Sequence, residues 1–212
     1  VRSLLADRRE LSLVILAALE RSPYLDDRVH FVHGTAGESG FESASAERAE
    51  SAVMLANQEI VDLAGRDAAT LVTSLTLKEY APQVYVCIQL YDSASLAHAA
   101  LSKADEVVVV GALAGGLLSR AVLDHGSSRA ITSLVRNDDE SCEIYRVEAP
   151  AGWIGETFTD ALVKAKNDMD ILLVGVEPAG GELIMNPSGD YLIQKQDMLA
   201  AISEERPDVT GA

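Results

Sequence analysis

Short apolar runs alternate with amphipathic segments along the first half of the chain. We expect five strands, at 11–18, 29–32, 51–56, 84–90 and 106–110. Between them, 41–49 is weakly helical, 66–80 is strongly amphipathic, and a helix capped by Ser93 runs to about Lys103. The inner face of 66–80 is predicted to carry Leu71, Val72, Leu75 and Leu77. This alternation predicts an α/β fold with a Rossmann-like, doubly wound parallel sheet.

The expected sheet lacks its usual beginning. A doubly wound nucleotide-binding sheet begins with a strand and a glycine-rich turn. Here Val1, Leu4 and Leu5 instead have the spacing of a helix end. The first strand is therefore expected to be missing from these residues: the chain is truncated, that segment is absent, or it is supplied elsewhere.

The segment 102–136 predicts a buried strand followed by two apolar-faced helices. The strand 106–110 ends at Gly111, and the two helices are separated by a hinge at His125-Gly126. These helices either pack on their own domain or join subunits, and we expect the second. The predicted dimer interface consists of Leu113, Leu117, Leu118, Ala121, Val122, Ile131, Leu134 and Val135.

After Arg136 the pattern changes to that of a small α+β lobe. A polar linker at 137–140 precedes an alternating strand at 142–147 and a helix at 157–166. Further strands are expected at 171–176, 183–185 and 197–202. The predicted organisation is an N-terminal lobe at 1–110, a crossover segment at 111–140, a C-terminal lobe at 141–203 and a tail at 204–212.

Composition excludes several classes of function. The 212 residues are 48% hydrophobic and 24% charged, with a formal net charge of −16. That charge disfavours nucleic acid and direct contact with anionic lipid. It is compatible with cation binding, although solubility explains acidity equally well. The sequence has no run approaching the roughly 18 apolar residues of a membrane span and no signal-peptide pattern. Two cysteines in unrelated segments fit a reducing compartment.

No catalytic arrangement is recognisable in the sequence. There is no Ser-His-Asp elbow and no HExxH or CxxC spacing, and the four histidines are scattered. We therefore expect a protein that is not an enzyme and has no catalytic residues.

Short motifs in both halves occur in the order of a known family. The N-terminal half contains Val29-His30-Phe31-Val32-His33-Gly34, Ala104-Asp105-Glu106-Val107-Val108 and Leu117-Leu118-Ser119-Arg120. The C-terminal half contains Gly175-Val176-Glu177, Glu182-Leu183-Ile184, Asn186-Pro187, Asp190-Tyr191 and Gln196-Asp197-Met198-Leu199. Together these resemble the regulator-of-K⁺-conductance (RCK, or KTN) domain, with its "FVHG", "GADxV" and "GVxR…ELIxNPxxDYxxxxGDxL" patterns. Lys103 replaces the glycine before "AD".

The resemblance implies a regulatory function. RCK domains form the gating rings of prokaryotic K⁺ channels and the regulatory subunits of Trk and Ktr transporters. It implies homodimers that assemble into tetramers or octamers, a cytoplasmic location at the inner face of the membrane, and a channel pore or transporter subunit as partner. Ligand binding in the clefts would move a hinge within each dimer. The family's ligands include Ca²⁺, Na⁺, Mg²⁺, ATP/ADP and NAD, and the sequence leaves the cofactor unassigned.

Departures from the family's sequence pattern reduce the range of ligands that we expect for this chain. Positions that correspond to the acidic residues of a Ca²⁺-gated member are Ala56, Gln89 and Tyr91, and none is a carboxylate. That particular Ca²⁺ site is therefore expected to be absent. Ala18 stands where nucleotide-binding members have an acidic residue, and Glu20 follows two residues later.

Candidate ligand-binding residues follow the expected strand ends, and each has a plainer interpretation. His33, Gly34 and Thr35 form a loop that suits a nucleotide, or simply a tight turn. Asn57 and Asp67 flank the next strand, and Asp67 would also serve as a helix cap. Glu20 would bond a ribose or lie exposed. A divalent cation is a weak possibility at the charged linker of Asp138, Asp139 and Glu140.

Two other functions remain open at this stage. One is a Rossmann-type NAD-dependent oxidoreductase, against which the missing glycine turn and acid–base set count. The other is a free-standing Trk- or Ktr-like regulatory subunit.

Overall fold

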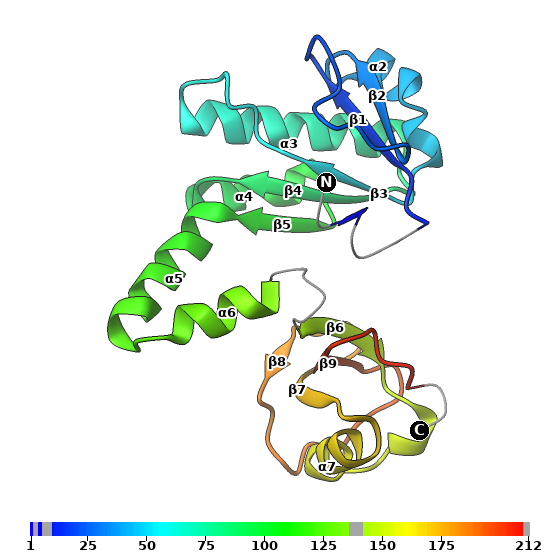
Figure 1. The fold of residues 1–212 in the computed structure, drawn as a ribbon, viewed down its shortest axis with the longest axis vertical. Coiled ribbons are helices and arrows are strands. Elements are labelled where there is room, and N and C mark those ends of the chain that lie inside the picture. The colour runs from blue at the N-terminus through cyan, green and yellow to red at the C-terminus, as the bar shows by residue number, and fades with distance from the viewer. Residues whose placement is uncertain (2–3, 6–9, 136–141, 210–212) are drawn as a thin grey trace. The chain divides into compact units, whose positions relative to one another are not determined.

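The computed structural model describes residues 1, 4–5, 10–135 and 142–209 (Figure 1). The chain divides into two compact units. One spans residues 9–125, and the other combines 1–8 with 126–212. The division falls between His125 and Gly126, the position at which the sequence predicts a hinge between two helices.

The unit at 9–125 is a parallel α/β structure, as predicted. Its elements are β1 (Leu13–Ala17), β2 (Val29–His33), α2 (Glu38–Ser43), η1 (Ala46–Arg48), β3 (Ser51–Met54), α3 (Leu63–Tyr80), β4 (Tyr85–Leu90), η2 (Ser93–Ser95), α4 (Leu96–Ala99), η3 (Ala100–Ser102), β5 (Glu106–Val109) and α5 (Val110–Leu123). The strands form two separate parallel sheets, β1-β2 and β3-β4-β5, rather than one.

A shared core joins the two sheets. The even-numbered residues of β4, from Val86 to Leu90, are fully buried and pack with Leu77 of α3 and Phe41 of α2. Leu16 of β1 packs against the same cluster, as do residues of β3. The rings of Phe41 and Tyr80 lie 6.2 Å apart, so that α2 contacts the C-terminal end of α3.

The buried stripe of α3 differs from the apolar face that periodicity predicts. Val72 is 64% exposed, and the expectation that it lies inside is wrong. The buried stripe consists of Asp67, Thr70, Ser74 and Leu77. Polar residues are tolerated there because their hydrogen bonds are made internally. Ser74 donates to the carbonyl of Ser102 at 3.1 Å, for example.

Two helix starts also differ from the sequence prediction. The helix α3 begins three residues early, because Asp62 caps it by accepting from the Gly65 amide at 2.8 Å. Asp67 therefore lies inside the helix and is not its cap. Similarly, Asp92 rather than Ser93 caps the segment leading to α4, through a hydrogen bond from the Ala94 amide.

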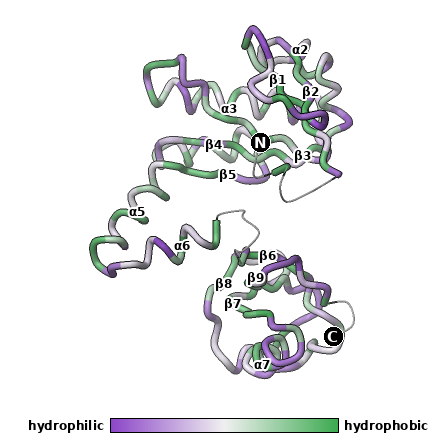
Figure 2. The backbone as a smooth tube through the Cα atoms, in the orientation of Figure 1, coloured by the Kyte–Doolittle hydropathy of each residue, from purple (hydrophilic) through white to green (hydrophobic). Residues whose placement is uncertain are grey.

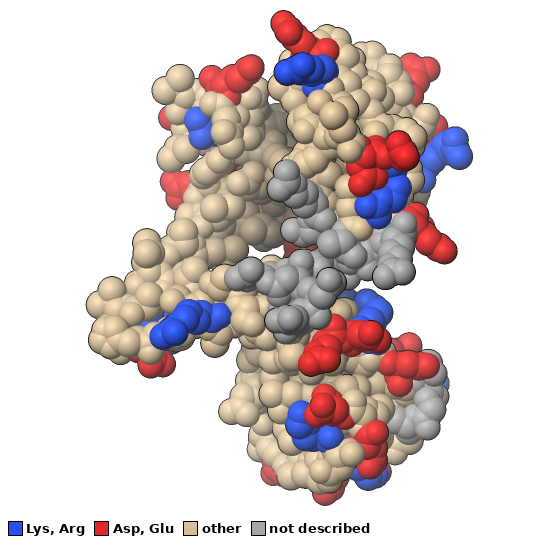
Figure 3. Space-filling view, in the orientation of Figure 1, with Lys and Arg blue, Asp and Glu red and all other residues tan. Residues whose placement is uncertain are grey.

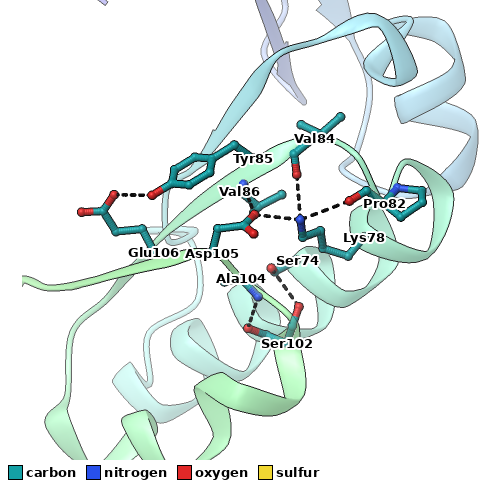
Figure 4. A network of polar contacts seen from close by, with 10 residues as sticks. All are labelled: Ser74, Lys78, Pro82, Val84, Tyr85, Val86, Ser102, Ala104, Asp105 and Glu106. Atoms are coloured by element: carbon teal, nitrogen blue, oxygen red, sulfur yellow. Dashed lines mark hydrogen bonds and ion pairs between the residues drawn. The ribbon is translucent and has the colours of Figure 1, made fainter. Parts of the chain in front are cut away.

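The "AD" of the family motif forms a clamp at the amino ends of β4 and β5 (Figure 4). One oxygen of Asp105 accepts from the Val86 amide at 2.7 Å and pairs with Nζ of Lys78 at 2.7 Å. Lys78 also donates to the Val84 carbonyl at 2.8 Å. The hydrogen bond from Lys78 lowers the pKa of Asp105. This motif therefore fastens α3 to the amino ends of the strands, opposite the strand ends that carry the candidate residues.

The other unit is the α+β lobe that the sequence predicts, preceded by α6. Its elements are α6 (Ser127–Val135), β6 (Glu143–Glu148), η4 (Ala151–Trp153), α7 (Phe158–Met169), β7 (Leu172–Glu177), β8 (Ile184–Met185) and β9 (Met198–Ser203). The antiparallel sheet has the order β6-β9-β7-β8. Its core contains Trp153, Phe158, Leu173, Val176 and Leu199, with Tyr191 packed beside it.

Left-handed residues explain two departures from the family's glycine pattern. Lys103 precedes the "AD" motif and has φ 55°. Gln196 occupies the glycine position of "GDxL" and has φ 73°. Glycine adopts this conformation without steric cost, and this chain instead places larger side chains there.

Candidate functional site at the carboxyl ends of the parallel strands

Asp67 organises the carboxyl end of β4. Its side chain is fully buried, and its two carboxylate oxygens accept from the amides of Tyr91 and Asp92 at 2.8 and 3.0 Å. Asp67 therefore holds the loop after β4 against the first turns of α3. Its predicted contact with a ligand stays a prediction.

Arg66 orders the loop between β3 and α3. Its Nε donates to the Ile60 carbonyl at 2.5 Å, and its Nη2 donates to the Gln58 carbonyl at 3.1 Å. The guanidinium also lies 5.4 Å from the centroid of the Tyr91 ring, within the range of a cation–π contact. Asn57 stabilises the same loop by accepting from the Glu59 amide at 2.9 Å. Sequence reasoning missed Arg66, since its partners are carbonyls that no motif marks.

Ala56, Gln89 and Tyr91, the three positions at which the resemblance led us to look for a Ca²⁺ site, lie at these strand ends. The buried Ala56 donates its amide to Oε1 of Gln89 at 3.2 Å, and Tyr91 lies beneath Arg66. None of these three residues carries a carboxylate. Within the described residues, no group of three or more His, Cys, Asp or Glu side chains is placed to hold a metal ion. The candidates Asp138, Asp139 and Glu140 lie outside the described residues.

A second group of predicted residues lies at the ends of β1 and β2. Nδ1 of His33 is 2.7 Å from the Leu19 carbonyl, and the Gly34 amide donates to the Ala17 carbonyl at 3.1 Å. Thr35 and Glu20 are exposed in the adjoining turns. The structure thus brings Glu20 near His33, Gly34 and Thr35 through these two turns, while Asn57 and Asp67 belong to the β3–β4 end.

The helices predicted to join subunits bury none of their residues. Both α5 and α6 are without a buried side chain in this chain. Leu118 and Val122 of α5 are 70% and 73% exposed. Figure 2 shows the hydrophobic colouring along α5, and Figure 3 shows the scarcity of charge around it, where Arg120 is the helix's one ionisable residue. Ile131 and Val135 of α6 are likewise exposed.

The first turn of α5 touches the candidate site. A Cβ placed on Gly111 would lie 2.4 Å from the carbonyl oxygen of Tyr91. The helix therefore approaches the end of β4 at a distance that only glycine permits. Tyr91 thus contacts three features: Asp67 through its amide, Arg66 through its ring, and α5 through its carbonyl.

Comparison with known proteins identifies the fold. A calcium-gated potassium channel, TvoK of Thermoplasma volcanium, is 24% identical over 97% of this chain and 59% of its own length. The GsuK RCK domain aligns with a TM-score of 0.42 and 16% identity, over 92% of this chain and 44% of that chain. The human SLO3 gating ring aligns with a TM-score of 0.73 and 21% identity, over 96% of this chain and 42% of that chain. This chain has an RCK fold.

This chain spans less than two thirds of the length of TvoK and of the SLO3 chain that it resembles. No family model matches it. In the described part of the chain, no helix combines the length and the hydrophobicity of a membrane span.

Proposed function

We propose that this chain is a ligand-sensing regulatory domain of a K⁺ channel or transporter, acting as a homodimeric unit of a cytoplasmic gating ring. The observation that carries the proposal is the apolar face of α5, which is left without cover in the chain's own fold. Large apolar faces of soluble proteins mark interaction sites. The RCK fold and the relationship to TvoK, a calcium-gated potassium channel, support a pore-forming partner.

The mechanism follows from the contacts of Tyr91. A ligand at the carboxyl end of β4 acts on the loop that Asp67 and Arg66 hold, and the Tyr91 carbonyl abuts the start of α5 at Gly111. Movement of that loop therefore tilts α5 and, in a dimer, the partner docked on it. A ligand changes the population of the two hinge states by its difference in affinity for them. The break at His125-Gly126, where Gly126 has φ 100°, supplies the flexible joint.

The ligand of the proposed regulatory domain is a nucleotide or a cation. Because Ala56, Gln89 and Tyr91 offer no carboxylate, Ca²⁺ is disfavoured at that position, although TvoK is calcium-gated. The turns bearing His33 and Gly34 present backbone groups suited to a nucleotide. Thermal unfolding should be measured with ATP, ADP, NAD, Na⁺, Mg²⁺ and Ca²⁺ in turn. A nucleotide that binds only the folded state raises the midpoint with concentration. If none of the six shifts the midpoint, the proposed ligand classes are wrong.

The dimer is tested by placing a charge on α5. Leu118→Asp puts a carboxylate on the proposed interface, and we expect light scattering after size exclusion to report a smaller mass than for the unmodified chain. Val72→Asp is the matched control, since Val72 is 64% exposed on α3 and should leave the mass unchanged. An unmodified chain that is monomeric at micromolar concentration, or a Leu118→Asp chain of unchanged mass, would contradict the interface.

A further inference from the structure

The segment that follows β9 packs against the C-terminal lobe. The sequence pattern predicts a tail at 204–212, and in the structure Val209 is 8% exposed and belongs to the core cluster of Trp153 and Phe158. We call residues 204–209 the strap. Apart from Val209 and the half-buried Pro207, its side chains are exposed: Glu204, Glu205, Arg206 and Asp208. The strap is therefore a polar segment with one apolar side chain inserted into the core.

The strap runs alongside β6 (Figure 1). Ser203, the last residue of β9, pairs with Glu143 at the start of β6. Three residues further along each segment, Nη2 of Arg206 donates to the carbonyl oxygen of Arg146 at 3.3 Å. The strap and β6 therefore advance in the same direction from a common starting point. Another three residues bring the strap to Val209, where it enters the core.

The Arg146 carbonyl lies on the free edge of β6. In the sheet order β6-β9-β7-β8, β6 is outermost, so among the described residues β9 is its one strand partner. The Ala149 amide donates to the carbonyl of Asp197, its opposite residue in the same register. Hydrogen-bonded and non-hydrogen-bonded pairs alternate along an antiparallel pair of strands, so Arg146, three residues away, points its backbone groups away from β9. Arg206 therefore binds the edge of β6 that no described strand occupies.

The strap covers this edge without extending the sheet. Unpaired N–H and C=O groups along an edge strand are a template for a further strand. The strap is not a strand of the sheet, and its Pro207 has no amide to donate to a neighbour. The edge is therefore shielded through the side chain of Arg206 rather than through a ladder of backbone hydrogen bonds.

The strap is held less firmly than the strand beside which it lies. The side chain of Arg146 crosses β9 and bonds twice to Glu177 of β7, with its Nε 2.7 Å and its Nη2 2.6 Å from the carboxylate oxygens. In contrast, Val209 is the strap's one buried side chain, and the hydrogen bond of Arg206 is long. Ordering the strap costs conformational entropy at each of its residues. Segments with few buried apolar contacts open locally at a fraction of the free energy of global unfolding.

We propose that the strap is a reversible cover, which opens while the C-terminal lobe stays folded and so uncovers the free edge of β6 and the core position of Val209. In the closed state, Arg206 is bonded to the Arg146 carbonyl and Val209 fills its place in the core. In the open state, that edge of β6 is exposed to solvent. The proposal rests on this lobe alone and is independent of the regulatory function proposed above.

The first test compares two matched thiols in the full chain. Val209→Cys places a thiol in the strap, and Val176→Cys makes the same substitution at a fully buried position of β7 in the same core. Labelling with a maleimide is read by mass spectrometry of peptides, so that the native Cys87 and Cys142 are followed separately. We expect the thiol at position 209 to react at least about tenfold more slowly than in the urea-unfolded chain, and at least about tenfold faster than the thiol at position 176. Urea below the unfolding transition should accelerate labelling at position 176 much more than at position 209, because opening the strap exposes little surface.

The contact with β6 is tested in the Val209→Cys chain. Arg206→Ala removes the hydrogen bond to the Arg146 carbonyl, and labelling at position 209 should become about threefold faster or more. Glu204→Ala is the matched control, because Glu204 is exposed on the same strap and its loss should leave the rate unchanged. Equal rates in these two variants would contradict the attachment of the strap to β6.

Two aspartate variants test the strap without an added thiol. Val209→Asp should release the strap and leave the lobe folded, so that Trp153 fluorescence still reports a cooperative urea transition, whereas Val176→Asp should unfold the lobe. Three results would overturn the proposal: labelling at position 209 as slow as at position 176, labelling at the rate of the unfolded chain, or loss of the folded lobe in Val209→Asp.

Discussion

Replacing Gly111 tests whether α5 is held against the end of β4. In the structure, an added Cβ would lie 2.4 Å from the Tyr91 carbonyl oxygen, whereas an ordinary contact begins at about 3.4 Å. Gly111→Ala therefore requires the start of α5 and the loop after β4 to separate by about 1 Å. Both are backbone segments, and the loop is fastened by Asp67, so the strain cannot be relieved by a side-chain rotation.

The magnitude follows from two opposing effects. Forcing additional atoms into a close contact destabilises a protein by about 1–3 kcal/mol. Alanine is intrinsically the better helix former, by up to about 1 kcal/mol, and this gain is smaller in a first turn. We expect Gly111→Ala to lower the free energy of unfolding by about 1–2 kcal/mol. Gly115→Ala should instead stabilise the chain by about 0.5–1 kcal/mol, because nothing lies within 4 Å of its added Cβ.

Urea unfolding followed by two signals separates local from general damage. The sole tryptophan, Trp153, is buried in the unit that combines 1–8 with 126–212, so its fluorescence reports on that unit. The circular dichroism signal also reports on the unit that contains α3 and α5. We expect the dichroism midpoint of Gly111→Ala to fall while the fluorescence midpoint stays constant. Equal stabilisation by Gly111→Ala and Gly115→Ala would refute the close approach of α5 to Tyr91.

Three further predictions concern single residues. Gln196→Gly should raise the free energy of unfolding by about 0.5 kcal/mol, read from the fluorescence midpoint, because glycine removes the strain of φ 73° but loses more entropy on folding. The hydrogen bond from Lys78 lowers the pKa of Asp105, so ionised Asp105 stabilises the folded state above the unfolded pKa, and this stabilisation is lost as pH falls through the folded pKa. Asp105→Asn should remove this part of the decrease in the free energy of unfolding at acid pH. Burial, and then its hydrogen bond to Asp197, raises the pKa of Tyr191 to about 12. The stabilisation of the folded state by neutral Tyr191 is therefore complete below the ordinary tyrosine pKa of about 10, and it is lost as pH rises through the folded value. An ultraviolet titration in which Tyr191→Phe removes no late-titrating phenol would contradict this assignment.

The order of elements was predictable because apolar runs and turn residues act locally. All five strands of the first half occur where the pattern places them, and the two crossover helices are separated at His125-Gly126 as expected. The inner face of α3 was not predictable from periodicity. Its buried positions include Asp67 and Ser74, which are satisfied by backbone groups far away in sequence. Hydrophobicity cannot identify a polar side chain whose partner lies on another element.

The candidate site likewise has some features that the sequence predicts and others that it does not. Residues such as His33 and Asn57 were candidates because they follow strands, and parallel strands end at a common edge. The contributions of Arg66 and Gly111 depend on the distances of carbonyl oxygens from atoms on another element, and no spacing in the sequence encodes those distances. The sequence pattern predicted one parallel sheet, and the division of its strands into β1-β2 and β3-β4-β5 became visible only in the observed pairing.

The contacts of Tyr91 distinguish what the backbone holds in place from what the side chains at the strand ends present. Its amide and carbonyl connect α3 to α5, and these backbone contacts do not require a tyrosine side chain. The side-chain positions at the strand ends, Ala56, Gln89 and Tyr91 itself, are free to vary without breaking that connection. None of these three residues is a carboxylate in this chain. In the mechanism that we propose, the side chains at these strand ends select the ligand, and the backbone that Asp67 and Gly111 hold in place transmits its binding to α5.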